Sequence, residues 1–220
     1  TYLVPLWGMG SDLTKGGKLN LDTREARQPF QLYGRMKQAG VLPKNIAEIP
    51  TDRIRIDMQA GNLLFAMSWG YVWNRLENDA DSKVKGQIGV ARLPHDQGGA
   101  SATCIGGWQV AVTAFSKNKQ EAVKFARYLS SPEVSKMQAI LASHLPVFPS
   151  VYKDPEVLKA NPWFADALPV VESAKSRPVS HQYPQVSDAI RSNMNAYLAG
   201  TKTTDAAIAD MKGKLTPIFR

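Results

Sequence analysis

A single cysteine, no long uncharged stretch and no internal repeat set the first limits on this 220-residue sequence. Cys104 alone cannot form a disulfide within the chain or supply a cysteine-rich zinc motif. No run approaches the roughly 18 to 20 apolar residues that a membrane-spanning helix needs. Hydrophobic residues make up 44% and charged residues 21%, which excludes a disordered or collagen-like chain and allows one or two domains with a core.

Basic residues are in excess, but they are not concentrated in one place. Lys and Arg number 27 against 19 Asp and Glu, a formal net charge of +8. The densest clusters lie in polar, loop-like settings at Lys15–Lys18, Lys83–Lys85 and Lys117–Lys119. A nucleic-acid-binding protein gathers such charge on one surface. We therefore expect solvated surface charge and no nucleic-acid partner.

The sequence contains none of the common motifs of serine hydrolases, zinc proteases or phosphate-binding loops. Cys104 could pair with a histidine as a nucleophile, although a small buried residue on a strand is the simpler interpretation. Asp79 and Asp81 resemble a carboxylate pair but stand in what looks like a solvated loop. The histidines are isolated from one another: His95, His144 and His181. We expect no metal, no cofactor and no catalytic activity.

Hydrophobic periodicity predicts a helix-rich chain after a turn-rich opening of about twenty residues. Helix starts are expected at Asp22 or Thr23, at Thr51 or Asp52, near Ser116, at Ser131, near Trp163, near Val186 and at Thr204. The expected stops are Gly40, Gly61, Pro146, Pro169 and Gly200. A proline-rich link is expected between Pro149 and Pro162.

Three short strands are expected among these helices. Leu63–Met67 is a continuous apolar run, Gln87–Leu93 ends at Pro94, and Cys104–Thr113 is interrupted by a pair of glycines. Because these strands alternate with helices and do not cluster as hairpins, a helix-rich, layered α/β arrangement is favoured over α+β.

Aromatic residues and glycines lie at or just beyond the ends of the expected strands. In open α/β sheets, ligand clefts form at such strand ends, and glycine lets the backbone approach a ligand closely. A flat ring can stack on the C–H face of a sugar while polar groups at the rim bind its hydroxyls. Trp73, like Trp7, could equally belong to the core. The candidate ligand-binding residues are Trp69, Tyr71, Trp73, Gly106, Gly107 and Trp108.

A series of different short motifs also follows along the chain in a recognisable order. They are Gly17–Asn20, Lys37–Pro43, Met58–Gly61, Trp69–Trp73, Ile88–Pro94, Gly106–Trp108, Ser116–Ala122, Tyr128–Glu133, Leu145–Pro146, Tyr152–Pro155 and Ser176–Pro178. Each motif alone is weak, but their order and spacing across nearly the whole chain resemble bacterial extracellular solute-binding proteins of family 1. These are the sugar-binding components of ABC transporters, and the trehalose/maltose-binding type is the most similar.

The resemblance implies a type II periplasmic-binding-protein fold, in which two lobes hinge and close around a solute. The chain resembles only the C-terminal half of such proteins. By resemblance, residues 1–102 and 146–220 belong to the second lobe, and residues 103–145 supply a hinge strand and helices of an incomplete first lobe. In the family, a comparable arginine precedes a proline after the late helices. Arg177 is therefore a further candidate, since its planar guanidinium can donate to two hydroxyls at once.

Helices expected over residues 116–142 carry apolar stripes that, by resemblance, pack on the sheet of the first lobe. Most of that sheet is missing from this chain. We therefore expect this segment to be less ordered than the rest or covered by a neighbouring chain.

The resemblance implies a periplasmic or extracellular protein that captures a mono- to oligosaccharide and delivers it to the membrane permease subunits of an ABC importer. Such a protein needs no cofactor, lies peripheral to the membrane and is monomeric at full length. The alternatives are a carbohydrate-active enzyme or a carbohydrate-binding module, with a nucleic-acid binder as a third. An enzyme would need two positioned carboxylates, and no acidic residue adjoins the candidate segments.

Overall fold

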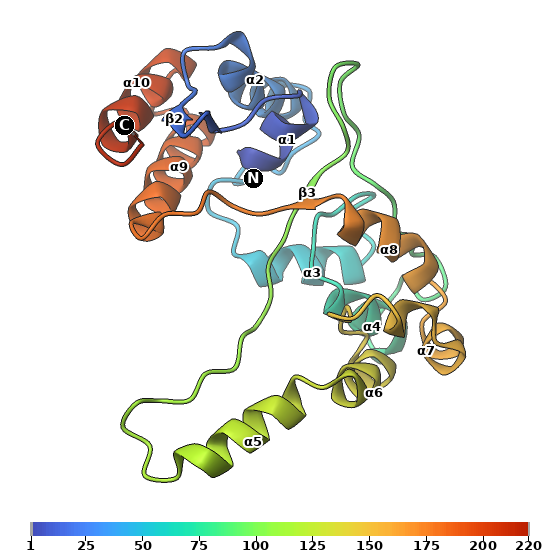
Figure 1. The fold of residues 1–220 in the computed structure, drawn as a ribbon. Helices are drawn as coiled ribbons and strands as arrows, with labels where there is room; N and C mark the ends of the chain where they lie inside the picture. Colours follow the sequence, from blue (N-terminus) through green and yellow to red (C-terminus); the bar gives the residue numbers. More distant parts are fainter. Residues whose placement is uncertain (1, 220) are drawn as a thin grey trace. The chain divides into compact units, whose positions relative to one another are not determined.

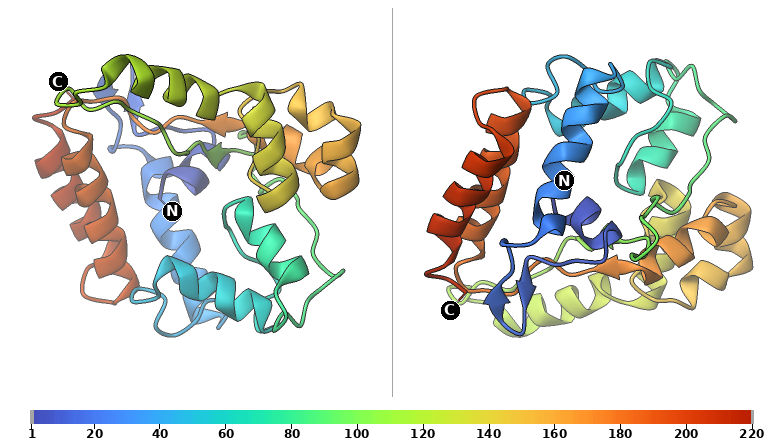
Figure 2. Two further views of the ribbon diagram at one scale, coloured as in Figure 1. Left: turned by 90° about the horizontal axis from the view of Figure 1, so that it is seen from below. Right: turned by 90° about the horizontal axis from the view of Figure 1, so that it is seen from above.

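The computed structural model describes residues 2–219, and the chain divides into two compact units. Unit 1 comprises Thr1–Ile49, Arg92–Ile105 and Ser173–Arg220, and unit 2 comprises Pro50–Ala91 and Gly106–Glu172 (Figures 1 and 2). These boundaries differ from the expected lobe boundaries near residues 102 and 146. The assignment of segments to the lobes of a longer protein stays a prediction.

Unit 1 combines helices with two small strand pairs. Its helices are α1 (Leu3–Gly8), α2 (Arg24–Gln38), α9 (Tyr183–Leu198) and α10 (Thr204–Leu215). The strands β1 (Thr14–Lys15) and β2 (Lys18–Leu19) pair in antiparallel fashion through a turn at Gly16 and Gly17, which have φ of 60° and 81°. The strands β3 (Thr103–Cys104) and β4 (Ala174–Lys175) pair in parallel, with Thr103 opposite Ala174.

The core of unit 1 lies between α1, α2, α9 and α10. The Phe30 ring of α2 lies 5.3 Å from the rings of both Tyr2 and Tyr197, measured between centroids. Trp7 is buried in this cluster, which decides between its two interpretations in favour of the core. The expectation of a purely turn-rich opening is wrong, because burial of its apolar side chains stabilises α1 without a side-chain cap.

Unit 2 is built from helices and irregular segments. Its elements are α3 (Thr51–Gln59), α4 (Tyr71–Asn78), α5 (Lys119–Leu129), α6 (Pro132–Ala142), a 3-10 turn η1 (Val151–Lys153), α7 (Pro155–Ala160) and α8 (Phe164–Glu172). One core cluster joins α6, η1, α7 and α8 around Tyr152, Trp163 and Phe164. A smaller cluster holds α4 through Val72, Leu76 and Val84.

Several predicted helix ends are confirmed by their capping geometry. Thr23 accepts a hydrogen bond from the Ala26 amide at 3.2 Å, and Ser131 accepts one from Val134 at 3.2 Å. Gly40 follows α2 with φ of 69°, a conformation that favours glycine. The last helix is capped by Thr203 and not by Thr204.

Other helix boundaries differ from the prediction. Pro50 precedes α3 without a side-chain cap, while Asp52 pairs with Arg55. Pro169 lies inside α8 and does not end it. The proline-rich link contains α7, because Asp154 caps its start by accepting from two backbone amides at 2.9 and 3.3 Å.

The three predicted strands are wrong for almost all of their length. Leu63–Met67 is irregular, with Leu64 and Phe65 about nine-tenths exposed, and Gln87–Leu93 forms no strand. Of Cys104–Thr113, only Cys104 belongs to a strand. A strand forms only where a second strand completes its ladder, and residues 2–219 supply no such partner for these segments.

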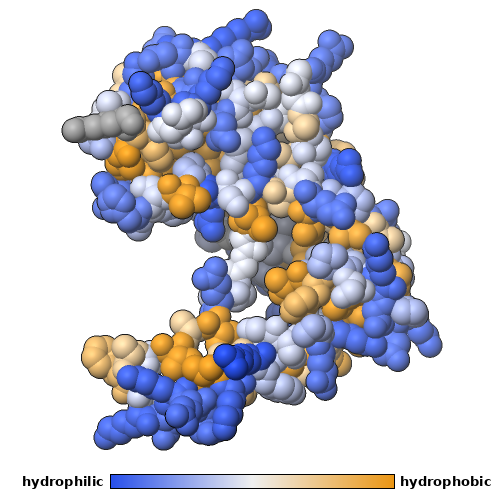
Figure 3. Space-filling view, viewed as in Figure 1, coloured by the Kyte–Doolittle hydropathy of each residue, from blue (hydrophilic) through white to orange (hydrophobic). Residues whose placement is uncertain are grey.

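The helix α5 stands apart from the cores of unit 2. None of its residues is buried, and its apolar side chains Val123, Phe125 and Tyr128 are exposed. Figure 3 shows apolar side chains along one edge of this helix and hydrophilic ones along the opposite edge. Within the described residues, nothing covers the apolar face of this helix.

No helix within residues 2–219 has the length and apolarity to cross a membrane.

Candidate functional site

The candidate aromatics of residues 69–73 begin a helix and do not follow a strand. Gly70 is the N-cap of α4, and the Trp69 carbonyl accepts from the Val72 amide at 3.0 Å. Because Val72 and Leu76 face the core of unit 2, the neighbouring positions point elsewhere. Trp69 is 53% exposed and Tyr71 is 39% exposed. The structure thus leaves two aromatic side chains accessible at the start of α4.

Trp73 takes a different role from its two neighbours. Its ring stacks on that of Trp163, with centroids 5.1 Å apart and planes inclined by 23°. Trp163 is itself buried, donates from Nε1 to Asn161 Oδ1 at 3.3 Å, and packs edge-on against Phe164. Trp73 is therefore a partly buried packing residue that ties α4 to the larger core.

The structure brings Gly106 to Trp69. A Cβ atom at Gly106 would lie 2.9 Å from Cη2 and 3.0 Å from Cζ3 of the indole. At Gly107, by contrast, a Cβ would meet no atom within 4 Å, and the next residue, Trp108, is fully exposed. Of the two glycines, Gly106 is the one at which a Cβ would meet another candidate residue.

Arg177 belongs to unit 1. Its guanidinium carbon lies 5.4 Å from the centroid of the Tyr183 ring, in the range of a cation–π interaction. Close by in sequence, Lys175 of β4 approaches the Trp7 ring at 6.0 Å. A part for Arg177 in sugar binding stays a prediction.

The sequence analysis missed a polar network that joins α3 to the loop after α4. Arg55 donates from its NH1 nitrogen to Gln59 Oε1 at 2.6 Å and forms two hydrogen bonds with Asp52. Gln59 is buried and donates from Nε2 to Asp81 at 2.6 Å, with a longer contact to Asp79. The signal was present, because Gln59 stands in the Met58–Gly61 motif, but its partners come from a distant loop.

The charges of this network are stabilised mutually. Hydrogen bonds from Arg55 lower the pKa of the Asp52 carboxyl, and Asp52 in turn raises the pKa of Arg55. Tyr71 lies close enough to contribute to the electrostatic environment of Arg55. Hydrogen bonds to Asp52 and Gln59 thus fix the guanidinium of Arg55.

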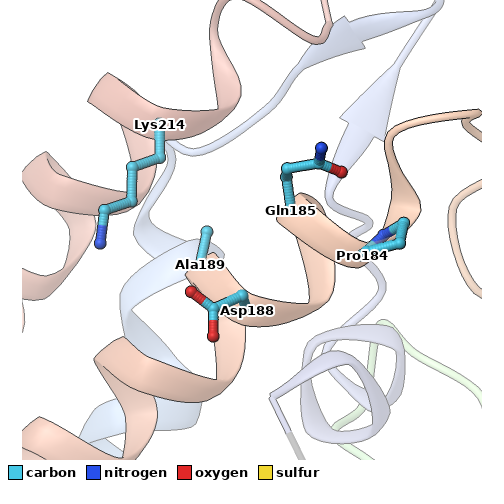
Figure 4. A pocket seen from close by; sticks show the side chains of 5 residues that line it. All are labelled: Pro184, Gln185, Asp188, Ala189 and Lys214. Atoms are coloured by element: carbon cyan, nitrogen blue, oxygen red, sulfur yellow. The ribbon is translucent and has the colours of Figure 1, made fainter.

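A surface depression in unit 1 lies at the start of α9 (Figure 4). Its lining residues are Pro184, Gln185, Asp188, Ala189 and Lys214. It offers no aromatic face for a sugar ring, and none of the predicted residues lines it. Within residues 2–219, no group of three or more His, Cys, Asp or Glu side chains is placed to hold a metal ion.

Comparison with known proteins gives the family. Residues 5–166 match the model of the bacterial extracellular solute-binding protein family. The chain belongs to this family. A probable ABC transporter-binding protein of Deinococcus radiodurans is 35% identical over 219 residues, which cover 98% of this chain and 51% of that protein.

Solved structures agree with this assignment. A maltose-bound MalE3 of T. maritima has a TM-score of 0.91 at 31% identity, covering 97% of this chain and 56% of that one. A solute-binding protein of Thermotoga lettingae bound with alpha-D-tagatose has a TM-score of 0.86 at 25% identity, covering 100% and 56%. The expected type II periplasmic-binding-protein fold is confirmed, and the chain spans about half the length of the relatives it matches.

Proposed function

We propose that this chain is part of the substrate-binding protein of an ABC importer, and that it captures a mono- to oligosaccharide outside the cytoplasmic membrane. In this proposal, Trp69 and Tyr71 stack on the sugar, and closure of two lobes traps it. The closed protein then delivers the sugar to the membrane permease subunits. The full-length protein acts as a monomer at the membrane surface, without a cofactor.

Family membership and the sugar ligands of two similar structures support the substrate class. The observation that carries the proposal is the exposure of Trp69 and Tyr71 on one short segment, with Trp73 and Trp163 stacked as a rigid base. A ligand that covers an accessible aromatic face removes apolar surface from water, which favours binding. A segment that fixes its backbone and leaves its rings accessible is suited to stacking.

Polar groups beside the rings supply the second requirement of a sugar site. Arg55, held by Asp52 and Gln59 in the same unit as Tyr71, has further N–H groups that can donate to sugar hydroxyls. Trp108, fully exposed in the same unit, offers a further platform for a longer oligosaccharide.

The alternative is a carbohydrate-active enzyme, which would use two carboxylates across the scissile bond. The nearest acidic pair to α4 is Asp79 and Asp81 at its C-terminal end. Both carboxylates accept hydrogen bonds from the Gln59 amide, and Asp79 also pairs with Arg75 at 3.4 Å. These contacts give the pair a structural role in joining α3 to α4, so we favour binding over hydrolysis.

The test is calorimetry on the complete gene product with a panel of sugars that includes maltose and tagatose. Trp69→Ala and Tyr71→Ala should each weaken the best sugar about fivefold or more, since a stacked ring contributes roughly 1 kcal/mol beyond its buried area. Trp69→Phe and Tyr71→Phe keep an aromatic face and serve as matched controls that retain most of the affinity. Unchanged affinity in both alanine variants would refute stacking at this segment. Hydrolysis of an oligosaccharide in the same samples would favour the alternative of a carbohydrate-active enzyme.

A further inference from the structure

Gly106 lies so close to the indole of Trp69 that a side chain at position 106 would collide with the ring. A Cβ there would lie 2.9 and 3.0 Å from two carbon atoms of the indole. Carbon atoms without a bond between them rest about 3.5 to 4.0 Å apart. An alanine at position 106 would therefore push the ring of Trp69 aside.

The backbone at Gly106 does not itself require glycine. The described glycines with positive φ do not include Gly106 or Gly107. Both positions are thus open to alanine as far as backbone conformation is concerned. What distinguishes the two glycines is the indole that lies against one of them and the open space beside the other.

Each of these two residues has a chain neighbour with backbone contacts of its own. The residue before Gly106, Ile105, donates its amide to the Lys175 carbonyl at 2.9 Å, which extends the pairing of β3 with β4. On the other side, Gly70 follows Trp69 and lies against Leu145, where a Cβ would come within 2.6 Å of Cγ. The backbone next to Trp69 thus has little free space, while 53% of the residue remains accessible.

We infer that Gly106 is a positioning residue for Trp69. Because glycine has no side chain, the indole lies directly against the backbone at position 106, and this contact, here called the seat, sets the orientation of the ring. The link to sugar rests on the proposed function, because only there does the orientation of the ring matter. A ring already held in one orientation loses less freedom when a ligand stacks on it, so its affinity is higher. This assigns to Gly106 a contact with Trp69 in place of the direct backbone contact with ligand expected from the sequence.

Fluorine NMR on protein labelled with 5-fluorotryptophan tests the seat without any sugar. The Trp69 resonance is the one lost in Trp69→Phe. Gly106→Ala should shift or broaden it, whereas the matched control Gly107→Ala should leave it in place. Equal spectra for the two glycine variants would overturn the inference, whatever the sugar data show.

Sugar affinity of the complete gene product then separates the inference from the proposed function. Gly106→Ala should weaken the best sugar about fivefold, similar to the loss of one stacked ring, and Gly107→Ala should change it less than twofold. In the Trp69→Phe background, Gly106→Ala should have no further effect, because phenylalanine lacks the atoms that the new Cβ would meet. If Gly106→Ala shifts the Trp69 resonance and leaves the sugar affinity unchanged, stacking by Trp69 is refuted and the positioning role of Gly106 is supported. If Trp69→Ala weakens binding while both glycine variants match the wild type, the seat is refuted and stacking stands.

Discussion

Replacement of Asn161 by alanine should be among the most destabilising polar substitutions in unit 2. Asn161 is 1% exposed and joins α6 to the start of α8. Its Nδ2 donates to the Ala139 carbonyl at 2.8 Å, and its Oδ1 accepts from Trp163 Nε1 at 3.3 Å and from the Ser143 hydroxyl. Ser143 ends α6 at φ of 52°, the one positive φ of a non-glycine residue within residues 2–219.

The magnitude follows from the partners that Asn161→Ala would leave behind. The Ser143 hydroxyl and the Trp163 indole N–H would be buried without an acceptor, while the Ala139 carbonyl keeps the Ser143 amide at 3.0 Å. Each buried polar group left unpaired costs about 1 to 3 kcal/mol. Two such groups therefore predict a loss of about 3 kcal/mol in the free energy of unfolding, a large share of an ordinary domain's stability.

Urea unfolding followed by tryptophan fluorescence measures this loss, because Trp163 and its partner Trp73 both report on the larger core of unit 2. The matched control is Asn118→Ala, which removes an exposed asparagine in the same unit that makes no side-chain cap bond to α5. The control should change the free energy of unfolding by less than about 0.5 kcal/mol. An Asn161→Ala variant within that range of its control would refute the reasoning from unpaired groups.

Two further predictions concern a charge cluster and an apolar face. Hydrogen bonds from Lys202 and Lys214 hold the pKa of the Asp210 carboxyl well below its usual range. The ionised carboxylate therefore stabilises the folded chain at neutral pH, and this contribution is lost as the pH falls through and below the ordinary pKa range of an aspartate. Asp210→Asn should therefore flatten the decline of Tm between about pH 5 and 2, and an unchanged slope would contradict this. Phe125 of α5 is 60% exposed, so Phe125→Ser in the 220-residue chain should change the free energy of unfolding by less than about 0.5 kcal/mol and reduce binding of a hydrophobic dye. A larger loss of stability would show that this face is covered.

Helices could be predicted from the sequence because their signals are local. Thr23 and Ser131 cap helices through amides only three residues away, and Gly40 ends α2 by its own backbone conformation. A pattern within a dozen residues therefore carries most of the information that a helix needs. The missed helix α1 lacks a side-chain cap and depends on burial of residues such as Trp7 by distant α2 and α9.

The candidate site was predictable in its residue types but not in its contacts. Glycines and aromatics beside apolar runs indicated a ligand surface, and the structure does place Gly106 against Trp69. The contact between Gly106 and the ring of Trp69 depends on how two segments that are distant in the sequence pack together, which no local pattern reveals. The polar partners of Gln59 were missed for the same reason, since Asp79 and Asp81 looked like loop residues when taken alone.

The predicted strands fail for a reason that also bears on function. Leu64 and Phe65 are about nine-tenths exposed, although their segment has the apolar pattern of a buried element. Each square ångström of apolar surface left in water costs about 25 cal/mol, so such segments are stable only where something covers them. The relatives that this chain matches are about twice as long. We therefore expect the exposed apolar segments and the bare face of α5 to pack against further parts of a longer protein. By resemblance, residues 103–145 would supply a hinge strand and helices of the first lobe of such a protein. The positions where the sequence predicts burial and the structure shows exposure thus mark where such contacts are expected.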